Sequence, residues 1–160
     1  MNTWESRAAQ LKRRYPEQFE DLPYYMVSID PGWFEPIEEA CRRIDALLTS
    51  KEKALFQWRQ IKEKFGGLRM YWNEGGVYLD FIGPDSLAHI VVEPAQPLLS
   101  EETRDRIAGI VAEAAKKATA RCQMCGAPGT LRRREDGWLV TACERHVEPP
   151  ELSDPQVDED

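Results

Sequence analysis

The 160-residue sequence has no apolar run long enough to cross a bilayer, and it contains only four cysteines and two histidines. A transmembrane helix needs about 20 mostly apolar residues, so we expect no association with a membrane. A secretory leader is not recognisable either, which predicts a cytoplasmic protein in which lasting disulfides are rare. Internal repeats are lacking as well. The length suits one domain with a small appendage.

The scarce metal-binding residues are concentrated near the carboxyl end. Cys122 and Cys125 form a C-x2-C pair, and Cys143 and His146 follow after seventeen residues. Three thiolates and one imidazole complete a tetrahedron around Zn²⁺, and four protein ligands leave no position for water. The spacing therefore predicts a structural zinc ion rather than a catalytic one. A redox C-x-x-C motif, a disulfide and unrelated thiols are the alternatives.

Residues 121–147 are predicted to form a zinc module of the zinc-ribbon or treble-clef type. Gly126, directly after Cys125, suits the tight positive-φ turn of a zinc knuckle. Asp136-Gly137 separates two short strand-like runs and is typical of a two-residue hairpin turn. A core this small would depend on the ion for folding. The fourth cysteine, Cys41, lies in a helical apolar stripe and is interpreted as a core residue.

Residues 1–120 are predicted to form a two-layer α+β domain. Apolar stripes and end signals such as Pro16, Asp30-Pro31 and Ser100 place the helices at about 3–15, 31–49 and 100–121. Alternating runs place the strands at about 57–65, 68–73, 77–82 and 87–93. We expect an antiparallel meander of three to four strands, with the second and third helices on its apolar face.

Two glycine pairs, Gly66-Gly67 and Gly75-Gly76, are interpreted as tight hairpin turns that set the register of this meander. Phe65 then opposes Leu68, and Ile61 opposes Trp72. The predicted core face consists of apolar positions on all four strands, with Glu63 and Glu74 as exceptions: Ile61, Phe65, Leu68, Met70, Trp72, Leu79, Phe81, Ala88, Ile90 and Val92.

The opposite face of the predicted sheet carries polar residues. The same register aligns Lys62, Tyr71, Asp80 and His89 in one row, and it pairs Lys64 with Arg69 in the next. Such a row could support acid–base chemistry or bind an anion. The alternative is a solvated face on which opposite charges pair across strands. No nucleophile or glycine-rich phosphate cradle accompanies the row.

The net charge of −7 is unevenly distributed. Residues 1–115 carry −5, residues 116–146 carry +4, and residues 147–160 carry −6. The acidic, proline-containing tail at 148–160 is predicted to be disordered. The zinc module and the helix before it supply a candidate basic patch: Lys116, Lys117, Arg121, Arg132, Arg134 and Arg145. On the predicted hairpin, Arg133 lies on the opposite side from Arg132 and Arg134.

Three segments together resemble a known family. They are Ile61 to Tyr71 (IKEKFGGLRMY), the upstream Gly32-Trp33, and the pattern C-x2-C-G-x-P-G … G-W-x-x-T-x-C-x2-H. The chain resembles a group of small, uncharacterised zinc-knuckle proteins of bacterial and phage genomes. The resemblance covers a little under half of the chain. It implies the four metal ligands and no catalytic residue.

Three functions are compatible with the sequence. The first is a non-enzymatic, zinc-stabilised protein that binds another protein as an adaptor, inhibitor or immunity-type factor, with its aromatic residues as anchors. The second is a nucleic-acid-binding protein that uses the basic zinc module. The third is an enzyme that uses the row Lys62, Tyr71, Asp80 and His89. It is the weakest of the three, because the row lacks a nucleophile and the predicted metal site has no open position.

Overall fold

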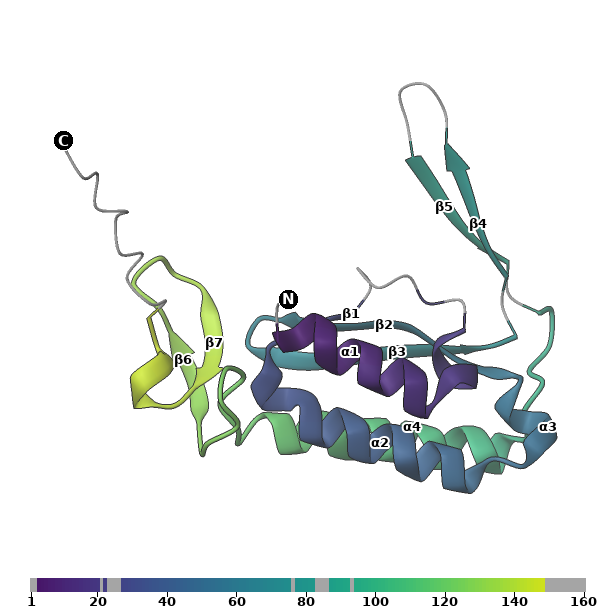
Figure 1. Cartoon of the computed structure of the whole chain (residues 1–160), viewed down its shortest axis with the longest axis horizontal. Helices are drawn as coiled ribbons and strands as arrows, with labels where there is room; N and C mark the ends of the chain where they lie inside the picture. The colour runs from purple at the N-terminus through teal and green to yellow at the C-terminus, as the bar shows by residue number, and fades with distance from the viewer. Residues whose placement is uncertain are drawn as a thin grey trace.

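A computed structural model describes residues 3–20, 22, 27–75, 77–82, 87–92 and 94–148 (Figure 1). The helices are α1 (Thr3–Arg14), α2 (Phe34–Leu47), α3 (Ser50–Lys53) and α4 (Glu101–Ala118), with short 3-10 turns at η1 (Pro16–Phe19), η3 (Pro31–Trp33) and η4 (Glu144–His146). The strands are β1 (Val27–Ser28), β2 (Phe56–Lys64), β3 (Gly67–Glu74), β4 (Val77–Ile82), β5 (Leu87–Val92), β6 (Thr130–Arg133) and β7 (Leu139–Ala142). The predicted mixed α+β fold is confirmed.

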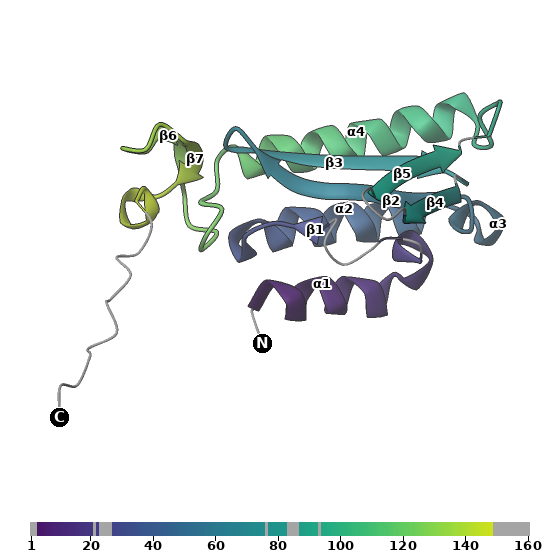
Figure 2. The ribbon, with the colours of Figure 1, turned by 90° about the horizontal axis from the view of Figure 1, so that it is seen from above.

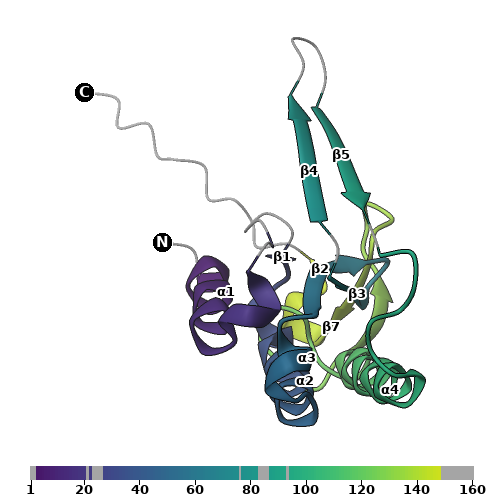
Figure 3. The same cartoon turned by 90° about the vertical axis from the view of Figure 1, so that its right-hand side faces the viewer.

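The main layer of strands has the order β1-β2-β3. β1 is parallel to β2, and β2 is antiparallel to β3. Helices α2 and α4 lie side by side on one face of this sheet, while α1 lies at the β1 side (Figures 2 and 3). No described helix covers the opposite face (Figure 3). One face of the sheet therefore packs in the core. The other face, which we call the open face, is not covered by a described helix along β2 and β3 (Figure 3).

The apolar stripes read from the sequence form the core. Ile37, Cys41 and Ile44 of α2 are fully buried, and Ile107, Ile110, Ala114 and Ala118 of α4 lie beside them. Burial raises the pKa of the Cys41 thiol to about 12, because the interior disfavours the thiolate. The interpretation of Cys41 as a core residue is confirmed.

The predicted helix at 31–49 begins differently from the expectation. Pro31 to Trp33 form a 3-10 turn, and the Asp30 side chain makes no capping hydrogen bond. Its Oδ2 instead accepts a hydrogen bond of 2.8 Å from Nε2 of Gln123. A separate short helix, α3, follows, with a capping box formed by Thr49 and Glu52. A tertiary contact has thus taken the place of the local cap.

The predicted register of β2 and β3 is wrong by two residues. The two turn residues are Phe65 and Gly66, with φ of 54° and 74°, and Ile61 pairs with Met70 instead of Trp72. A shift of two residues keeps each side chain on its predicted face. The exception is Phe65, which becomes part of the turn and is 67% exposed.

A β-bulge between Trp58 and Gln60 adds two large core residues that the alternation did not predict. The bulge shifts the alternation by one position, so Phe56 and Trp58 face the core on one side of it and Ile61 on the other. Phe56 contacts Trp58 edge-to-face, with ring centroids 5.0 Å apart.

The predicted four-stranded meander is wrong. β4 pairs with β5, in the predicted register of Asp80 opposite His89, but these strands form a sheet of their own. The hairpin projects from the body (Figures 1 and 3). Glu74 accepts hydrogen bonds from the backbone N–H groups of Leu98 and Leu99, so the chain returning from β5 docks at the end of β3 where β4 was expected.

Among the described helices, none combines the length and the apolar character needed to span a membrane. The predicted disordered tail falls almost entirely outside the described residues, which end at Glu148. The predicted second glycine turn falls partly outside them, because Gly76 is not described.

Candidate metal centre

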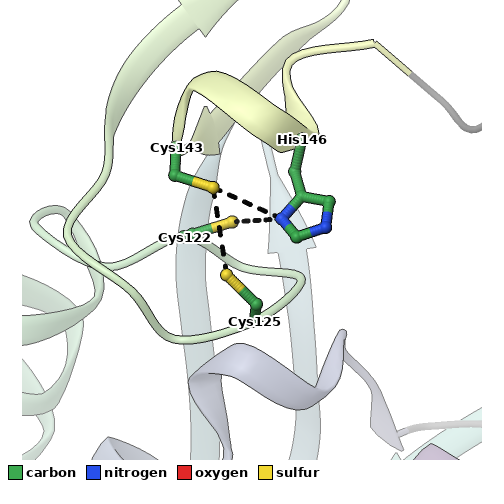
Figure 4. Close-up of side chains that lie close together, drawn as sticks. All are labelled: Cys122, Cys125, Cys143 and His146. Carbon is green, nitrogen blue, oxygen red and sulfur yellow. Dashed lines mark hydrogen bonds between the residues drawn. The ribbon is translucent and has the colours of Figure 1, made fainter.

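The first pair of candidate ligands lies on a tight knuckle directly after α4. The backbone N–H of Cys122 donates to the carbonyl of Ala127 (2.7 Å), and the N–H of Gly126 donates to the carbonyl of Cys122 (2.8 Å). Gly126 has φ of 77°, as predicted for this turn. These bonds direct Sγ of both Cys122 and Cys125 toward the same point (Figure 4).

The second pair lies where β7 ends. Cys143 precedes the η4 turn and His146 closes it, and the N–H of His146 donates to the carbonyl of Cys143 (3.0 Å). Nδ1 of His146 faces the sulfur atoms, 3.3 Å from Sγ of Cys143 and 3.6 Å from Sγ of Cys122 (Figure 4). Sγ of Cys125 lies 3.9 Å from Sγ of Cys143.

These distances fit a single tetrahedral ion. With Zn–S bonds of about 2.3 Å, two sulfur ligands lie about 3.8 Å apart at the tetrahedral angle. All four ligand atoms lie within 4.8 Å of one another. All four cysteines of the chain are free thiols, so the predicted alternative of a disulfide finds no support. The four residues Cys122, Cys125, Cys143 and His146 could hold one metal ion.

The electrostatics of the knuckle favour a thiolate at Cys122. Burial acts to raise its pKa, but hydrogen bonds to the sulfur outweigh burial and lower the pKa of this thiol to about 6. The donors are the backbone groups of Cys143, Cys125 and Met124 and the His146 side chain. The backbone hydrogen bond from Ala127 lowers the pKa of the Cys125 thiol, but partial desolvation and the neighbouring thiols together outweigh it, so the pKa is raised. Thiolate is the metal-binding form of cysteine.

The hairpin between the two pairs differs from its predicted turn. The backbone N–H of Arg134 donates to the carbonyl of Trp138 (2.8 Å), which encloses a three-residue loop at 135–137 rather than a two-residue turn. Arg132 pairs with Val140 and Arg133 with Leu139, so consecutive arginines alternate sides as predicted.

The knuckle is fixed to the main domain by hydrogen bonds. The N–H of Gly32 donates to the carbonyl of Gln123 (2.7 Å), and Nε1 of Trp33 donates to the carbonyl of Arg121 (3.0 Å). A Cβ at Gly32 would lie 2.1 Å from the carbonyl oxygen of Cys122. The knuckle and η3 therefore pack with no space between them.

Gln123 is a central residue of this junction that the sequence does not single out. It is 8% exposed, and its side chain reaches Asp30 while its backbone N–H donates to the carbonyl of Thr141 (2.8 Å). Thr141 in turn donates from Oγ1 to the carbonyl of Gly66 in the β2–β3 turn (2.6 Å). A glutamine inside a knuckle gives no signal of burial in the sequence.

The candidate basic patch is partly neutralised. Lys117 pairs with Glu39 of α2 (2.5 Å), Arg121 with Glu35, and Arg134 with Asp136 (2.8 Å). Within the described residues, Lys116, Arg132 and Arg145 have no ion pair. The six residues therefore do not form one continuous field of unpaired charge.

The candidate polar row is divided between two sheets. Lys62 and Tyr71 remain neighbours on the open face of β2–β3, with Nζ of Lys62 5.8 Å from the centroid of the Tyr71 ring. Asp80 and His89 pair on the separate β4–β5 hairpin. Lys64 pairs with Gly67, and Arg69 pairs with Lys62 instead of Lys64.

Comparison with protein-family models, with curated proteins and with solved structures finds no match to this chain.

Proposed function

We propose that this chain is a non-enzymatic binding protein whose carboxyl-terminal module is held in shape by one structural zinc ion. The observation that supports it is the set of four protein ligands, three Sγ atoms and one Nδ1, at tetrahedral spacing. Four protein ligands leave the ion no position for water or substrate. Soft thiolate ligands with one imidazole favour zinc over the hard cations.

The ion would link distant segments rather than react. Cys122 and Cys125 follow α4, and Cys143 and His146 follow β7. Next to these ligands, Arg121, Gln123 and Thr141 form hydrogen bonds with Trp33, Gly32 and Gly66 of the main domain. Zinc binding would then supply folding energy for a zinc-ribbon or treble-clef-like module. It would also hold that module against the main domain.

The enzyme alternative loses its geometric support. Its row of Lys62, Tyr71, Asp80 and His89 required four adjacent strands, and β3 and β4 belong to different sheets. The remaining neighbours, Lys62 and Tyr71, contribute a cation and a phenol but no nucleophile or carboxylate. A binding role is the simpler interpretation of this surface.

A protein partner is the first candidate for what is bound. Phe65, Leu131 and Trp138 are large apolar side chains that are more than half exposed, and aromatic residues are favoured anchors in interfaces. An adaptor, an inhibitor or an immunity-type factor, as found in phage-related settings, would use such anchors.

Nucleic acid is the second candidate, and a specific observation favours it. Lys62, Lys64 and Arg69 on the open face of β2–β3 form no ion pair with an acidic residue that the structure describes, whereas Lys117 and Arg121 of the zinc-module patch are paired. The candidate nucleic-acid-binding surface is therefore the open face of the sheet rather than the zinc module.

Metal analysis tests the proposed function directly. We expect the purified chain to contain one zinc ion per chain and to lose stability when a chelator removes it. Cys143→Ser should lower zinc content and stability together. The matched control, Cys41→Ser, should keep the zinc although it removes a core thiol. Absence of stoichiometric metal from the wild-type chain would contradict the proposal.

A further inference from the structure

The open face of β2–β3 combines cations and exposed rings. We name Lys62, Lys64, Phe65, Arg69 and Tyr71 the basic–aromatic face. Phe65 is 67% and Tyr71 45% exposed, and the side chains of Lys64 and Arg69 are also exposed. The alternate positions, Ile61, Leu68 and Met70, are buried in the core. No acidic residue shares the outward positions of these strands between Gln60 and Tyr71.

Two of the cations lie directly opposite each other. Lys62 pairs with Arg69 across the two strands. Like charges at opposed positions destabilise a sheet. Among the described residues, no carboxylate forms an ion pair with either side chain. A solvated face selected for stability would pair opposite charges here, so this arrangement favours an anionic ligand.

Each ring of the face has an ammonium group against it. Nζ of Lys62 lies 5.8 Å from the centroid of Tyr71, and Nζ of Lys64 lies 5.3 Å from the centroid of Phe65. The two rings lie about five residues apart along the strands, which is about 16 Å at about 3.3 Å per residue, and the two lysines lie between them. Each ring and its lysine offer a planar surface for a base and a charge for a phosphate.

Phe65 holds its position at an energetic cost. Its φ of 54° is a left-handed conformation that bulky residues rarely adopt. The turn is fixed from behind, because Thr141 donates to the carbonyl of Gly66 and a Cβ at Gly66 would lie 2.4 Å from Cδ1 of Leu131. The zinc hairpin therefore supports a strained turn whose phenyl ring remains in solvent. Ligand binding is a reason to retain that ring.

We propose that the basic–aromatic face binds single-stranded nucleic acid, with bases stacked on Tyr71 and Phe65 and phosphates at Lys62, Lys64 and Arg69. This proposal names the ligand of the binding protein proposed above and rests on that function. Lysine is depleted in protein interfaces, whereas lysines interleaved with rings are typical of single-strand binding. The composition of this face therefore favours nucleic acid over a protein partner.

The charge distribution elsewhere directs a polyanion to this face. Many acidic residues lie on the helices of the opposite side, where Glu39 and Glu113 form ion pairs with Lys117 and Arg43. Lys117 and Arg43 are therefore engaged by carboxylates, whereas Lys62 and Arg69 form no ion pair with a described residue. A negatively charged chain of −7 can thus still present a positive surface.

The test is fluorescence anisotropy with the full, zinc-loaded chain and labelled oligothymidylate or oligouridylate of about 15 nucleotides. Three phosphate contacts predict a slope of log K against log salt of about −2 for a single strand, so affinity should fall about 20-fold between about 50 and 200 mM salt. The two probes distinguish DNA from RNA as the source of the ligand. A duplex of the same length should bind more weakly, because its bases are already stacked.

Substitutions separate stacking from folding. Tyr71→Ala should weaken binding about fivefold or more. Phe65→Asn should weaken it to a similar extent but raise the melting temperature by about 4 °C, since Asn-Gly is the preferred pair for this turn. Loss of binding with a gain of stability is a result that a purely structural role of Phe65 would not give.

A charge-matched pair of variants tests location. Lys62→Glu/Arg69→Glu should abolish measurable binding, whereas Lys51→Glu/Arg106→Glu changes the net charge equally at exposed positions on α3 and α4 and should change affinity less than about threefold. Equal losses in both variants would overturn the proposed site.

Two further outcomes overturn the proposal while leaving the zinc-stabilised binding protein intact. One is no binding of either probe at about 50 mM salt by a chain that contains stoichiometric zinc. The other is equal affinity for polyglutamate of the same length, which would assign the face to an acidic protein segment. Absence of zinc from the folded wild-type chain would instead contradict the proposed function.

Discussion

The hydroxyl group of Thr141 donates a hydrogen bond of 2.6 Å to the carbonyl oxygen of Gly66, 75 residues away in the sequence. It joins the last strand of the metal module to the turn that carries Phe65. Thr141 is 1% exposed, so water cannot replace this bond in the folded chain. The metal centre and the open sheet face are therefore physically linked.

Thr141→Val removes this link while keeping the volume of the side chain. We expect the free energy of unfolding to fall by about 1–2 kcal/mol, because the Gly66 carbonyl loses its buried donor. Urea denaturation measures this change in the free energy of unfolding. Thr130→Val is the matched control, since Thr130 is exposed on β6 and should change stability by less than about 0.5 kcal/mol. Similar values for both variants would show that the link does not stabilise the fold.

Gly32→Ala tests the junction between η3 and the knuckle that carries Cys122 and Cys125. A Cβ at this position would lie 2.1 Å from the carbonyl oxygen of Cys122 and 2.6 Å from that of Gln123. Both obstacles are backbone atoms, so the knuckle has to move, and we expect a loss of about 3 kcal/mol in stability with weaker zinc retention.

Gly109→Ala provides the opposite control for Gly32→Ala. Gly109 lies inside α4, and a Cβ there would meet no atom within 4 Å. Alanine should raise the free energy of unfolding by about 0.5–1 kcal/mol, because it favours the helix. Thermal unfolding followed by circular dichroism compares the two. Equal tolerance of both substitutions would contradict the close packing at Gly32.

The sequence predicts features that depend on neighbouring residues. The apolar stripes of α2 and α4 are confirmed, and the four residues predicted as ligands lie close together, because helical periodicity and the reach of a knuckle are local properties. Ser100 likewise caps α4 as expected, with Oγ accepting from the N–H of Thr103 (3.1 Å). Each of these requires only a few consecutive residues.

The features that were missed depend on contacts between distant segments. Asp30 binds Gln123 instead of capping a helix, and Phe65 rather than Gly67 shares the turn with Gly66, whose carbonyl accepts a hydrogen bond from Thr141. Glu74 binds the returning chain at Leu98, which displaces β4 from the edge of β3. In each case a long-range hydrogen bond or contact overrides a valid local preference.

Thiol reactivity distinguishes the core cysteine from the ligands. Burial raises the pKa of Cys41 to about 12, so its thiolate is scarce near neutral pH and its sulfur is covered. In the zinc-loaded chain at neutral pH we expect slow reaction of all thiols with a disulfide reagent. A chelator should release three reactive thiols, and denaturant should release the fourth.

Cys41→Ala identifies that fourth thiol. The variant should give the same three thiols on chelation and no further one on denaturation. Rapid reaction of a fourth thiol in the folded, zinc-loaded wild-type chain would mean that Cys41 is not protected by the core.

Acidification should release the metal, because the thiolate ligands become protonated. Because the pKa of the Cys122 thiol is lowered to about 6 from its ordinary value near 9, the stability that its thiolate contributes is fully present above about pH 9 and is lost as the pH falls through about 6. Protons compete with zinc for the same sulfur. We expect zinc to be retained at pH 7.5 and released below about pH 6, as measured with a chromogenic zinc indicator.

Fluorescence of Trp33 should change together with zinc release, since its indole N–H donates to the carbonyl of Arg121, the residue before Cys122. Cys41→Ser should leave the midpoint unchanged, whereas full zinc retention at about pH 4 would be incompatible with three thiolate ligands.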